Sequence, residues 1–548
     1  MLKKIIAAMN PAERVAAVAA AAVLLLAVAG LVGQYLLIRS QVVPTRGGTF
    51  TEGMVGQPAL VNPVLAKSEV DRALVRLTFR NLSDLAEKVE ALPDKSHRVW
   101  RIRLREGQVW QNGQKVISDD VVFTIQRIQD PAGGSPLASS WQGVAVQRLS
   151  ELEIQFSLAL PYAFFPDTLR DLYPIPKHIF ADIPTENWRL SRYLLEPVGN
   201  GPFQFDAYDK RPDGFITAYY LKASTRPSGP EPRLSALTIR FSSNLEEVIR
   251  SWNTGRIDGW VSPEPDAYLA SKRPYLVHAF SLPSYYAIFL NPSRNSIFKE
   301  AVVRQALERA ADREALIRDA LGGQGGPVIG PIPPGASYYQ TAAGSTDGRN
   351  VSDLLAQGGW TADTEKGGRS KIVGKTVTPL EFTLIVPRLS FLVRSAEELA
   401  EQWRAAGFKV NLDIQPPEEV TERAIKNRDY EAILFGNVLG PSSDLFSFWH
   451  SSERFYPGMN LALYSDRQVD NLIEAVRTSF NTEERAAKQA DLQKLIAADH
   501  PVVFLYSLPL LYVTSRSIQG IATSTIFTPA DRFDQVTDWY LKTKRVLK

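Results

Sequence analysis

The sequence predicts an α/β fold that is divided into at least two lobes and preceded by one transmembrane helix. Three observations support this prediction. A single hydrophobic core stops growing beyond about 250 to 300 residues, and this chain has 548. Strand-like and helix-like patterns alternate along residues 380–435. An apolar segment occupies residues 15–38.

The apolar segment 15–38 is long enough to cross a bilayer. Its only polar side chains are Gln34 and the hydroxyl-bearing Tyr35. About 24 helical residues at ~1.5 Å each reach roughly 36 Å, which exceeds a hydrocarbon core of about 30 Å. Asn10, Pro11 and Glu13 fit the N-cap, N1 and N3 positions of a capping box, so we expect the helix to begin there.

The basic residues around this segment favour one orientation. Lys3, Lys4 and Arg14 precede it, against Arg39 and Arg46 after it. This small excess predicts a cytoplasmic N-terminus (1–14), a single-pass anchor in the cell membrane (15–38) and a linker (39–48), with the rest extracytoplasmic. A cleaved signal peptide is the alternative, because small residues at 27–29 resemble a processing site. The apolar run is longer than the usual signal core.

Composition excludes several classes of function. The net charge of +3 arises from 62 basic and 59 acidic residues, so there is no electrostatic footprint for nucleic acid. The chain contains no cysteine. Disulfides, thiolate nucleophiles, cysteine-ligated metals and a lipid-modified cysteine are therefore excluded.

The C-terminal half predicts a mostly parallel sheet. Its expected strands and helices alternate in the order Leu380–Val386, Phe391–Ala406, Phe408–Ile414, Glu418–Asn427 and Tyr430–Phe435. Ligands of such sheets bind beyond the carboxyl ends of the strands. Arg388 follows the first strand and Asp444 follows the third, so the two side chains are candidates to bind the carboxylate and the amine of a small zwitterion. The alternative is two unrelated surface charges.

The N-terminal half contains two further predictable units. Residues 99–105 alternate apolar and arginine side chains, as in a half-buried strand, and Ser118 with two following aspartates predicts the cap of a helix. Residues 203–208 and 215–221 flank a turn with proline and glycine, which predicts a β-hairpin.

No motif indicates catalysis, a cofactor or a metal site. The five histidines are scattered singly, and neither HExxH, GxSxG nor a phosphate-binding glycine loop is present. Ser296 and Lys299 form an SxxK pair without its companion motifs. The glycines at 322–326 follow a predicted helix, whereas a dinucleotide loop follows a strand, so we expect a flexible connection.

Several segments resemble, in order, the extracytoplasmic solute-binding proteins of ABC importers that bind dipeptides, oligopeptides and sometimes nickel (family 5). The strongest match is WRIRLREGQVWQNGQKVISDDVVFTIQRIQDP at 100–131. Others are GGTFTEGMVGQPALVNPVLA (47–66), PIPKHIF (174–180), PVGNGPFQF (197–205), WNTGRID (252–258), VRQALERAADREALI (303–317) and GPIPPG (330–335). The likeness extends over residues 47–521.

The resemblance implies a two-lobed clamp of the type II periplasmic-binding-protein kind with an inserted subdomain. Lobe I would comprise residues 47–78, 191–286 and 506–548, the insert residues 79–190, and lobe II residues 287–505. The chain would cross between the lobes near 286–291 and 504–507.

The resemblance also implies roles for two residues. Arg388 in VPRLSF stands where dipeptide binders have an arginine for the ligand carboxylate, and Asp444 lies in a loop whose aspartate takes the ligand amine. Ser442 and Ser443 depart from the acidic residue and proline common there. Four aromatic residues are further candidates to line the pocket: Tyr285, Tyr286, Trp360 and Trp449.

The predicted function is capture of a short peptide or similar small solute by lobe closure, followed by delivery to ABC permease subunits in the same membrane. The protein is expected to act as a monomer, without cofactor or catalysis. The alternative is a sensor or scaffold that keeps this fold and recognises a protein partner.

Overall fold

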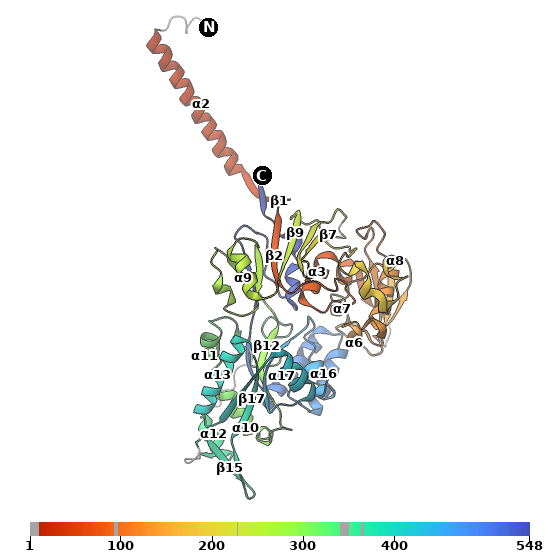
Figure 1. Cartoon of the computed structure of the whole chain (residues 1–548), viewed down its shortest axis with the longest axis vertical. Coiled ribbons are helices and arrows are strands. Elements are labelled where there is room, and N and C mark those ends of the chain that lie inside the picture. Colours follow the sequence, from red (N-terminus) through yellow and green to blue (C-terminus); the bar gives the residue numbers. More distant parts are fainter. Residues whose placement is uncertain (1–9, 93–96, 227, 340–349, 363–366, 548) are drawn as a thin grey trace.

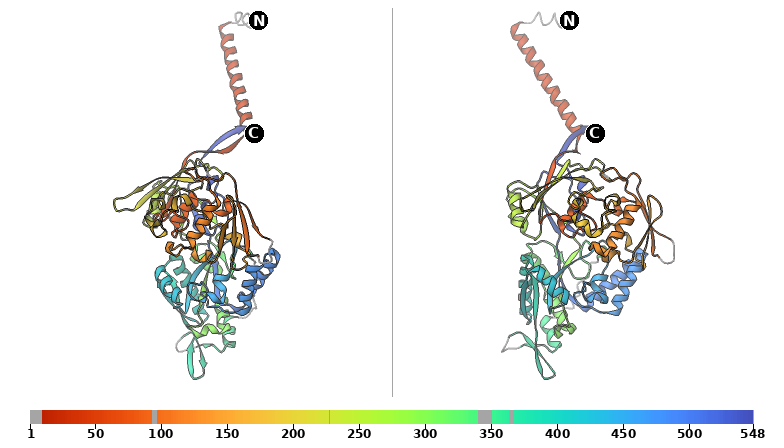
Figure 2. Two further views of the ribbon diagram at one scale, coloured as in Figure 1. Left: turned by 90° about the vertical axis from the view of Figure 1, so that its right-hand side faces the viewer. Right: turned by 45° about the vertical axis from the view of Figure 1, so that its right-hand side comes forward.

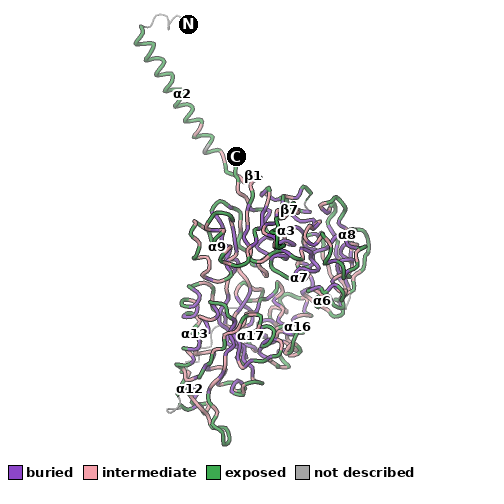
Figure 3. The backbone as a smooth tube through the Cα atoms, in the orientation of Figure 1, coloured by how far each residue is buried: buried purple, intermediate pink, exposed green. Residues whose placement is uncertain are grey.

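The computed structural model describes residues 10–92, 97–226, 228–339, 350–362 and 367–547. One long helix, α2 (Pro11–Arg39), projects from the rest of the chain (Figure 1) and is exposed along its length (Figure 3). Its segment Pro11–Leu36 is long and apolar enough to cross a membrane. The predicted capping box is confirmed, because Asn10 Oδ1 accepts from the Glu13 amide and Glu13 Oε2 from the Asn10 amide, both at 2.9 Å. Lys3 and Lys4 lie outside the described residues.

Within the expected linker, residues 40–45 form a strand. β1 (Ser40–Thr45) pairs antiparallel with β22 (Lys542–Leu547), with Ser40 opposite Leu547 and Thr45 opposite Lys542. The β-branched residues of β1 suit this conformation. Its partner comes from the other end of the chain, so no local pattern could show the pairing.

Lobe I, nearer to α2 in Figure 1, is built on a seven-stranded sheet with the order β11-β21-β10-β2-β9-β8-β7. The strands are β2 (Thr49–Val55), β7 (Phe203–Lys210), β8 (Ile216–Ala223), β9 (Ala236–Ser242), β10 (Gly259–Ser262), β11 (Leu276–Phe280) and β21 (Leu510–Thr514). Helices α3 (Glu69–Thr78) and α9 (Leu245–Asn253) accompany it. The predicted hairpin is confirmed as the β7–β8 pair.

The inserted subdomain contains an antiparallel sheet with the order β3-β4-β6-β5. Its main elements are β3 (Ala86–Ala91), β4 (Val99–Leu104), α5 (Ser118–Gln129), α6 (Ala138–Trp141), β5 (Ala145–Arg148), β6 (Glu153–Ser157), α7 (Phe165–Thr168) and α8 (Lys177–Phe180). Trp100, Ile102 and Leu104 of β4 are buried, as predicted. The cap of α5 is one residue earlier than predicted, because the Asp120 carboxylate accepts from the amide of Ile117 at 3.0 Å.

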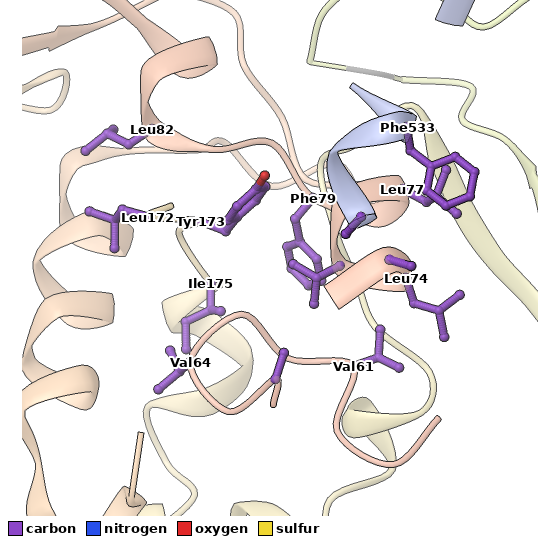
Figure 4. Packing of buried hydrophobic residues seen from close by; sticks show 14 of the residues in the cluster. Val61, Val64, Leu74, Leu77, Phe79, Leu82, Leu172, Tyr173, Ile175 and Phe533 are labelled. Carbon is purple, nitrogen blue, oxygen red and sulfur yellow. The ribbon is translucent and has the colours of Figure 1, made fainter. Parts of the chain in front are cut away.

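One hydrophobic core joins lobe I to the insert. Figure 4 shows Leu74 and Leu77 of α3 and Phe533 near Phe79, while Ile175 of the insert lies close to Val64. All these side chains are at least nine-tenths buried. Lobe I and the insert therefore share one packed interior.

Lobe II is built on a six-stranded mixed sheet with the order β13-β20-β12-β19-β17-β18. Its strands are β12 (Ser284–Leu290), β13 (Gly326–Pro327), β17 (Glu381–Pro387), β18 (Lys409–Gln415), β19 (Ala432–Val438) and β20 (Val502–Ser507). Helix α13 (Ser390–Ala405) ends before Gly407, which has a φ of 98°. The predicted βαβαβ unit is confirmed, because β17 pairs parallel with both β18 and β19.

Further helices and a small sheet complete lobe II. The helices are α10 (Ala301–Ala310), α11 (Arg313–Ala315), α12 (Val351–Gln357), α14 (Pro417–Glu419), continued by a π-helical turn (Val420–Ile425), α15 (Phe446–Trp449), α16 (Arg467–Thr478) and α17 (Thr482–Asp499). Strands β14 (Thr361–Ala362), β15 (Arg369–Val373) and β16 (Thr376–Pro379) form a sheet at the end of the molecule away from α2 (Figure 2).

The two lobes are joined by two adjacent crossings. One runs from β11 to β12 through residues 281–283, and the other runs from β20 to β21 through residues 508–509. Both lie a few residues from the predicted segments. Because β12 neighbours β20 and β11 neighbours β21, the crossings connect neighbouring strands in each sheet.

Candidate functional site: the cleft between the lobes

A cavity of about 460 Å³ lies between the lobes next to the crossings. Both lobes contribute to its wall, Met54 and Val261 from lobe I, and Tyr286 and Phe391 from lobe II. Leu508 of the second crossing also lines it. Most of the lining side chains are apolar, so the cavity offers a solute mainly hydrophobic burial.

The charged groups of this wall are few. Glu69 and Glu264 come from lobe I, and Arg532 contributes a guanidinium that already has a partner. Arg532 Nη2 lies 2.9 Å from Glu52 Oε1, and both side chains are almost completely buried. Burial raises the pKa of Glu52, and the charge of Arg532 opposes that rise. The pair therefore stabilises the part of the cavity wall that lobe I contributes.

The two lobes touch on the side of the cleft near α13. Arg394 of α13 pairs with Asp266 of lobe I at 3.0 Å, and the hydroxyl of Ser390 donates to Glu264. The arginine also donates to the carbonyl of Ala320 at 3.0 Å. These contacts join the start of α13 to lobe I.

A second set of contacts joins the insert to lobe II. Asp444 Oδ2 lies 3.1 Å from Arg477 Nε and accepts a hydrogen bond of 3.1 Å from the hydroxyl of Tyr162. The Ala163 amide donates to the Arg477 carbonyl at 2.8 Å. The guanidinium of Arg477 also lies over the ring of Phe446, 4.2 Å from its centroid. Burial and the nearby Asp444 carboxylate raise the pKa of Tyr162, so its hydroxyl stays a donor.

The two charged residues predicted for the site have different contacts in the structure. Arg388 follows β17 directly and is exposed, and its guanidinium donates to the Ile414 carbonyl at 3.3 Å. No carboxylate of the described residues pairs with it. Asp444 is bound to Arg477 and Tyr162, as described above. Neither residue lines the 460 Å³ cavity, so their ligand contacts stay predictions.

Of the four aromatic candidates, Tyr286 lines the cavity. Tyr285 is the next residue of the same strand, so it points to the opposite face, where its hydroxyl accepts from Asn437 at 3.0 Å. Trp360 is fully buried and donates to Glu300 at 3.1 Å. Trp449 is also buried in the core of lobe II. None of these three side chains lines the cavity.

Sequence reasoning missed most of the cavity wall. Met54, Val261, Leu282, Phe391 and Leu508 are apolar residues in unremarkable local patterns. One signal was present, because the tripeptide Ser-Leu-Pro occurs at 281–283 and again at 507–509, at the two crossings. Recognising its meaning requires the pairing of distant strands.

No group of three or more histidine, aspartate or glutamate side chains able to hold a metal occurs within the described residues. His450 stacks on Phe446 and lies 3.5 Å from Glu474, and His278 contacts the hydroxyl of Thr514. Burial lowers the pKa of His278. These contacts explain the two histidines as parts of the local packing.

Two α/β lobes that meet over an apolar cleft and are joined by two adjacent crossings define a two-lobed binding protein. The sequence model of the bacterial extracellular solute-binding proteins, family 5 Middle, matches residues 63–455. That is well over half of the chain, and the protein belongs to this family.

Its relatives align with most of this chain and with most of their own length. The oligopeptide-binding protein AppA of Bacillus subtilis is 23% identical over 493 residues, which cover 84% of this chain and 87% of AppA. Protein XP55 of Streptomyces lividans is 26% identical over 490 residues, which cover 86% of this chain and 85% of XP55.

Solved structures show the same fold. AppA of Bacillus subtilis in complex with a nonapeptide is similar with a TM-score of 0.70 and 22% identity, over 91% of this chain and all of that one. The ABC transporter substrate-binding protein CtaP of Listeria monocytogenes has a TM-score of 0.76 and 21% identity over the same shares.

Proposed function

We propose that this protein captures a short peptide or peptide-like solute between its lobes and delivers it to ABC permease subunits in the same membrane. The single observation that carries the proposal is the cavity of about 460 Å³ whose wall comes from both lobes. Membership of a solute-binding family and the names of its relatives, oligopeptide-binding among them, support a peptide as solute. The protein acts by binding, without catalysis.

The same proposal assigns α2 as a membrane anchor. Its apolar segment Pro11–Leu36 is exposed, although a helix with this composition is unstable in contact with water. The basic residues before it favour a cytoplasmic N-terminus, with both lobes on the extracytoplasmic side. Because the chain has no cysteine that could be modified with lipid, α2 anchors the protein in the membrane.

Arg388 is the proposed partner of the ligand carboxylate. It has no carboxylate partner among the described residues, and closure around a peptide would bring it into a drier environment where an ion pair is stronger. Asp444 is the proposed partner of the ligand amine. Arg477 now neutralises its carboxylate, so an incoming ammonium would have to displace that guanidinium.

Native mass spectrometry of the full chain in detergent tests the proposed function. We expect a solute of peptide mass to be retained, and isothermal titration with synthetic peptides to give saturable binding. Arg388→Ala should weaken binding of peptides with a free carboxylate roughly 10- to 100-fold, and leave C-terminally amidated peptides unaffected.

Arg318→Ala is the matched control, because Arg318 is an exposed arginine paired with its neighbour Asp319 at 2.7 Å. Equal loss of affinity in both variants, or no difference between free and amidated peptides, would contradict the role of Arg388. Absence of any bound solute across the peptide panel would contradict the proposed function itself.

A further inference from the structure

The ribbon formed by β1 and β22 carries a concentration of positive charge where α2 ends. Arg39, Lys542, Lys544 and Arg545 lie in or beside it. Residues 39–51 and 541–547 contain no aspartate or glutamate. We call β1, β22 and Arg39 together the basic ribbon.

The cations of the basic ribbon are available to a partner. The three basic residues of β22 are exposed. Arg545 donates to the hydroxyl of Ser40 at 3.1 Å, and Arg39 lies over the ring of Tyr35. No carboxylate within the described part of the chain pairs with any of the four cations. Arg46, just beyond β1, differs because it pairs with Glu231 at 2.6 Å.

One face of the basic ribbon combines charge with exposed apolar surface. The register places Val42 opposite Arg545 and Ser40 opposite Leu547, and alternate residues share a face. Val42 is 55% exposed and Leu547 is 64% exposed. Cations next to apolar side chains, directly after a membrane span, are typical of the membrane interface.

The basic ribbon also lies close enough to the end of α2 for its charges to interact with a membrane surface. A strand rises about 3.3 Å per residue, so Arg545, which lies opposite Val42, is roughly 10 Å beyond the end of α2. That is a little more than the Debye length of about 8 Å at physiological ionic strength, so a charged bilayer surface attracts the cation there, with reduced strength.

We propose that the basic ribbon binds the headgroups of anionic phospholipids in the bilayer that α2 spans. Arg545 contacts the lipid phosphates, while Leu547, on the same face and opposite Ser40 at the end of α2, enters the boundary between headgroups and acyl chains. Lys544, on the opposite face, adds positive charge near the same surface. This inference rests on the proposed anchoring by α2. It gives the C-terminal strand a function in holding the lobes near the membrane surface.

The absence of cysteine makes the test direct, because Thr543→Cys provides a single attachment point for a fluorophore. The full chain would be placed in nanodiscs of phosphatidylcholine, with or without phosphatidylglycerol, that contain a headgroup-attached nitroxide quencher. We expect phosphatidylglycerol to raise the ratio of quenched to unquenched fluorophore roughly fivefold for each contacting cation. Added salt should reverse this increase.

Lys544→Glu combined with Arg545→Glu should abolish the increase. Lys210→Glu combined with Arg211→Glu, at the end of β7 and the start of the turn to β8, is the matched control for the change in net charge. The proposal is wrong if the variant with Lys544→Glu and Arg545→Glu is quenched as much as the unsubstituted protein. It is also wrong if neither phosphatidylglycerol nor salt changes the quenching.

Two further outcomes are distinguishable. Failure of the chain to enter any nanodisc would contradict the anchor, and with it the basis of this proposal. Quenching that rises only when permease subunits are added would overturn it in favour of a protein partner. If the charge-reversed variant does not fold, the salt dependence of quenching in the unsubstituted protein still tests the proposal.

Discussion

At the residue scale, the buried pair of Glu52 and Arg532 fixes the lobe I wall of the cleft. Their side chains are 0% and 1% exposed, and the hydroxyl of Tyr512 donates to Glu52 at 2.5 Å. Breaking such a pair leaves an uncompensated charge in the interior, whereas removing both partners does not.

Arg532→Leu should therefore lower the free energy of unfolding by about 3 to 5 kcal/mol. The double variant Glu52→Leu with Arg532→Leu should lose clearly less. Chemical denaturation of the full chain in detergent measures both. Additive losses in the double variant would show that the two side chains are not coupled.

Asp534 gives the protein a predictable response to pH. Its side chain is 33% exposed and lies near Asp531. Partial burial raises its pKa to about 6, although Arg76 opposes the rise. An aspartate in the unfolded chain has a pKa of about 3.9, so the folded state holds this proton more tightly. Stability from this group is present below about pH 4 and is lost as the pH rises to about 6.

Asp534→Asn should reduce the fall in the free energy of unfolding between about pH 4 and pH 6 by about 1 kcal/mol. This value is lowered to allow for the partial exposure of the carboxyl. Thermal midpoints measured between about pH 4 and pH 6 would show it. Asp182→Asn, at an exposed position in the insert, should leave the profile unchanged. A profile that stays as steep in Asp534→Asn would contradict the raised pKa.

Single residues were also where sequence reasoning was least complete. Arg388 and Asp444 were found because charged groups at strand ends are visible in the sequence. The structure shows that Asp444 has a partner in Arg477, 33 positions away in the chain. For Tyr285 and Tyr286, adjacency in one strand means that only one can face the cleft, and the sequence did not show which one.

At the scale of elements, the glycines of the PVGNGPFQF segment connect the insert to lobe I. The chain leaves lobe I after Thr78 and returns through Gly199 and Gly201. The Gly201 amide donates to the Thr78 carbonyl at 2.8 Å. A Cβ at Gly199 would lie 1.8 Å from that carbonyl oxygen. Glycine is required here because two backbone segments meet closely.

Gly199→Ala should lower the free energy of unfolding by about 3 kcal/mol, since the Thr78 backbone would have to move. Gly330→Ala is the matched control, because a Cβ there meets nothing within 4 Å. Chemical denaturation of the two variants should separate them clearly. Equal stability would contradict the close approach at Gly199.

Elements with a strong local pattern were predictable. The capping box at Asn10, the alternation in β4 and the βαβαβ unit all depend on residues close together in the chain. The pairing of β1 inside the expected linker was not predicted, because its partner β22 lies about 500 positions away. Pairing over such a separation leaves no local signature.

At the scale of the whole molecule, contacts between the insert and lobe II hold the lobes together. The Tyr162 hydroxyl bridges to Asp444, and Arg477 pairs with the same carboxylate. A hydrogen bond to a charged group contributes about 1.5 to 3 kcal/mol. Its loss should shift the equilibrium towards separated lobes.

Tyr162→Phe should lower the ratio of closed to open molecules about tenfold. Spin labels on Asp182→Cys and Glu483→Cys, in the insert and in lobe II, would report longer distances in that variant. Tyr220→Phe is the matched control, because its hydroxyl donates to Asp209 within lobe I at 2.5 Å. Unchanged distances in Tyr162→Phe would show that this bridge does not hold the lobes.

The two crossings have a consequence for how the lobes can move. Each contains Leu-Pro, and proline has no N–H, so it cannot continue the hydrogen-bond ladder of either sheet. We expect two neighbouring strands that are both interrupted at the crossings to bend about a line across them more easily than they twist. The lobes should then rotate mainly about that one axis. Leu282 and Leu508, which lie at the crossings, should keep their separation, while groups far from the axis should move furthest.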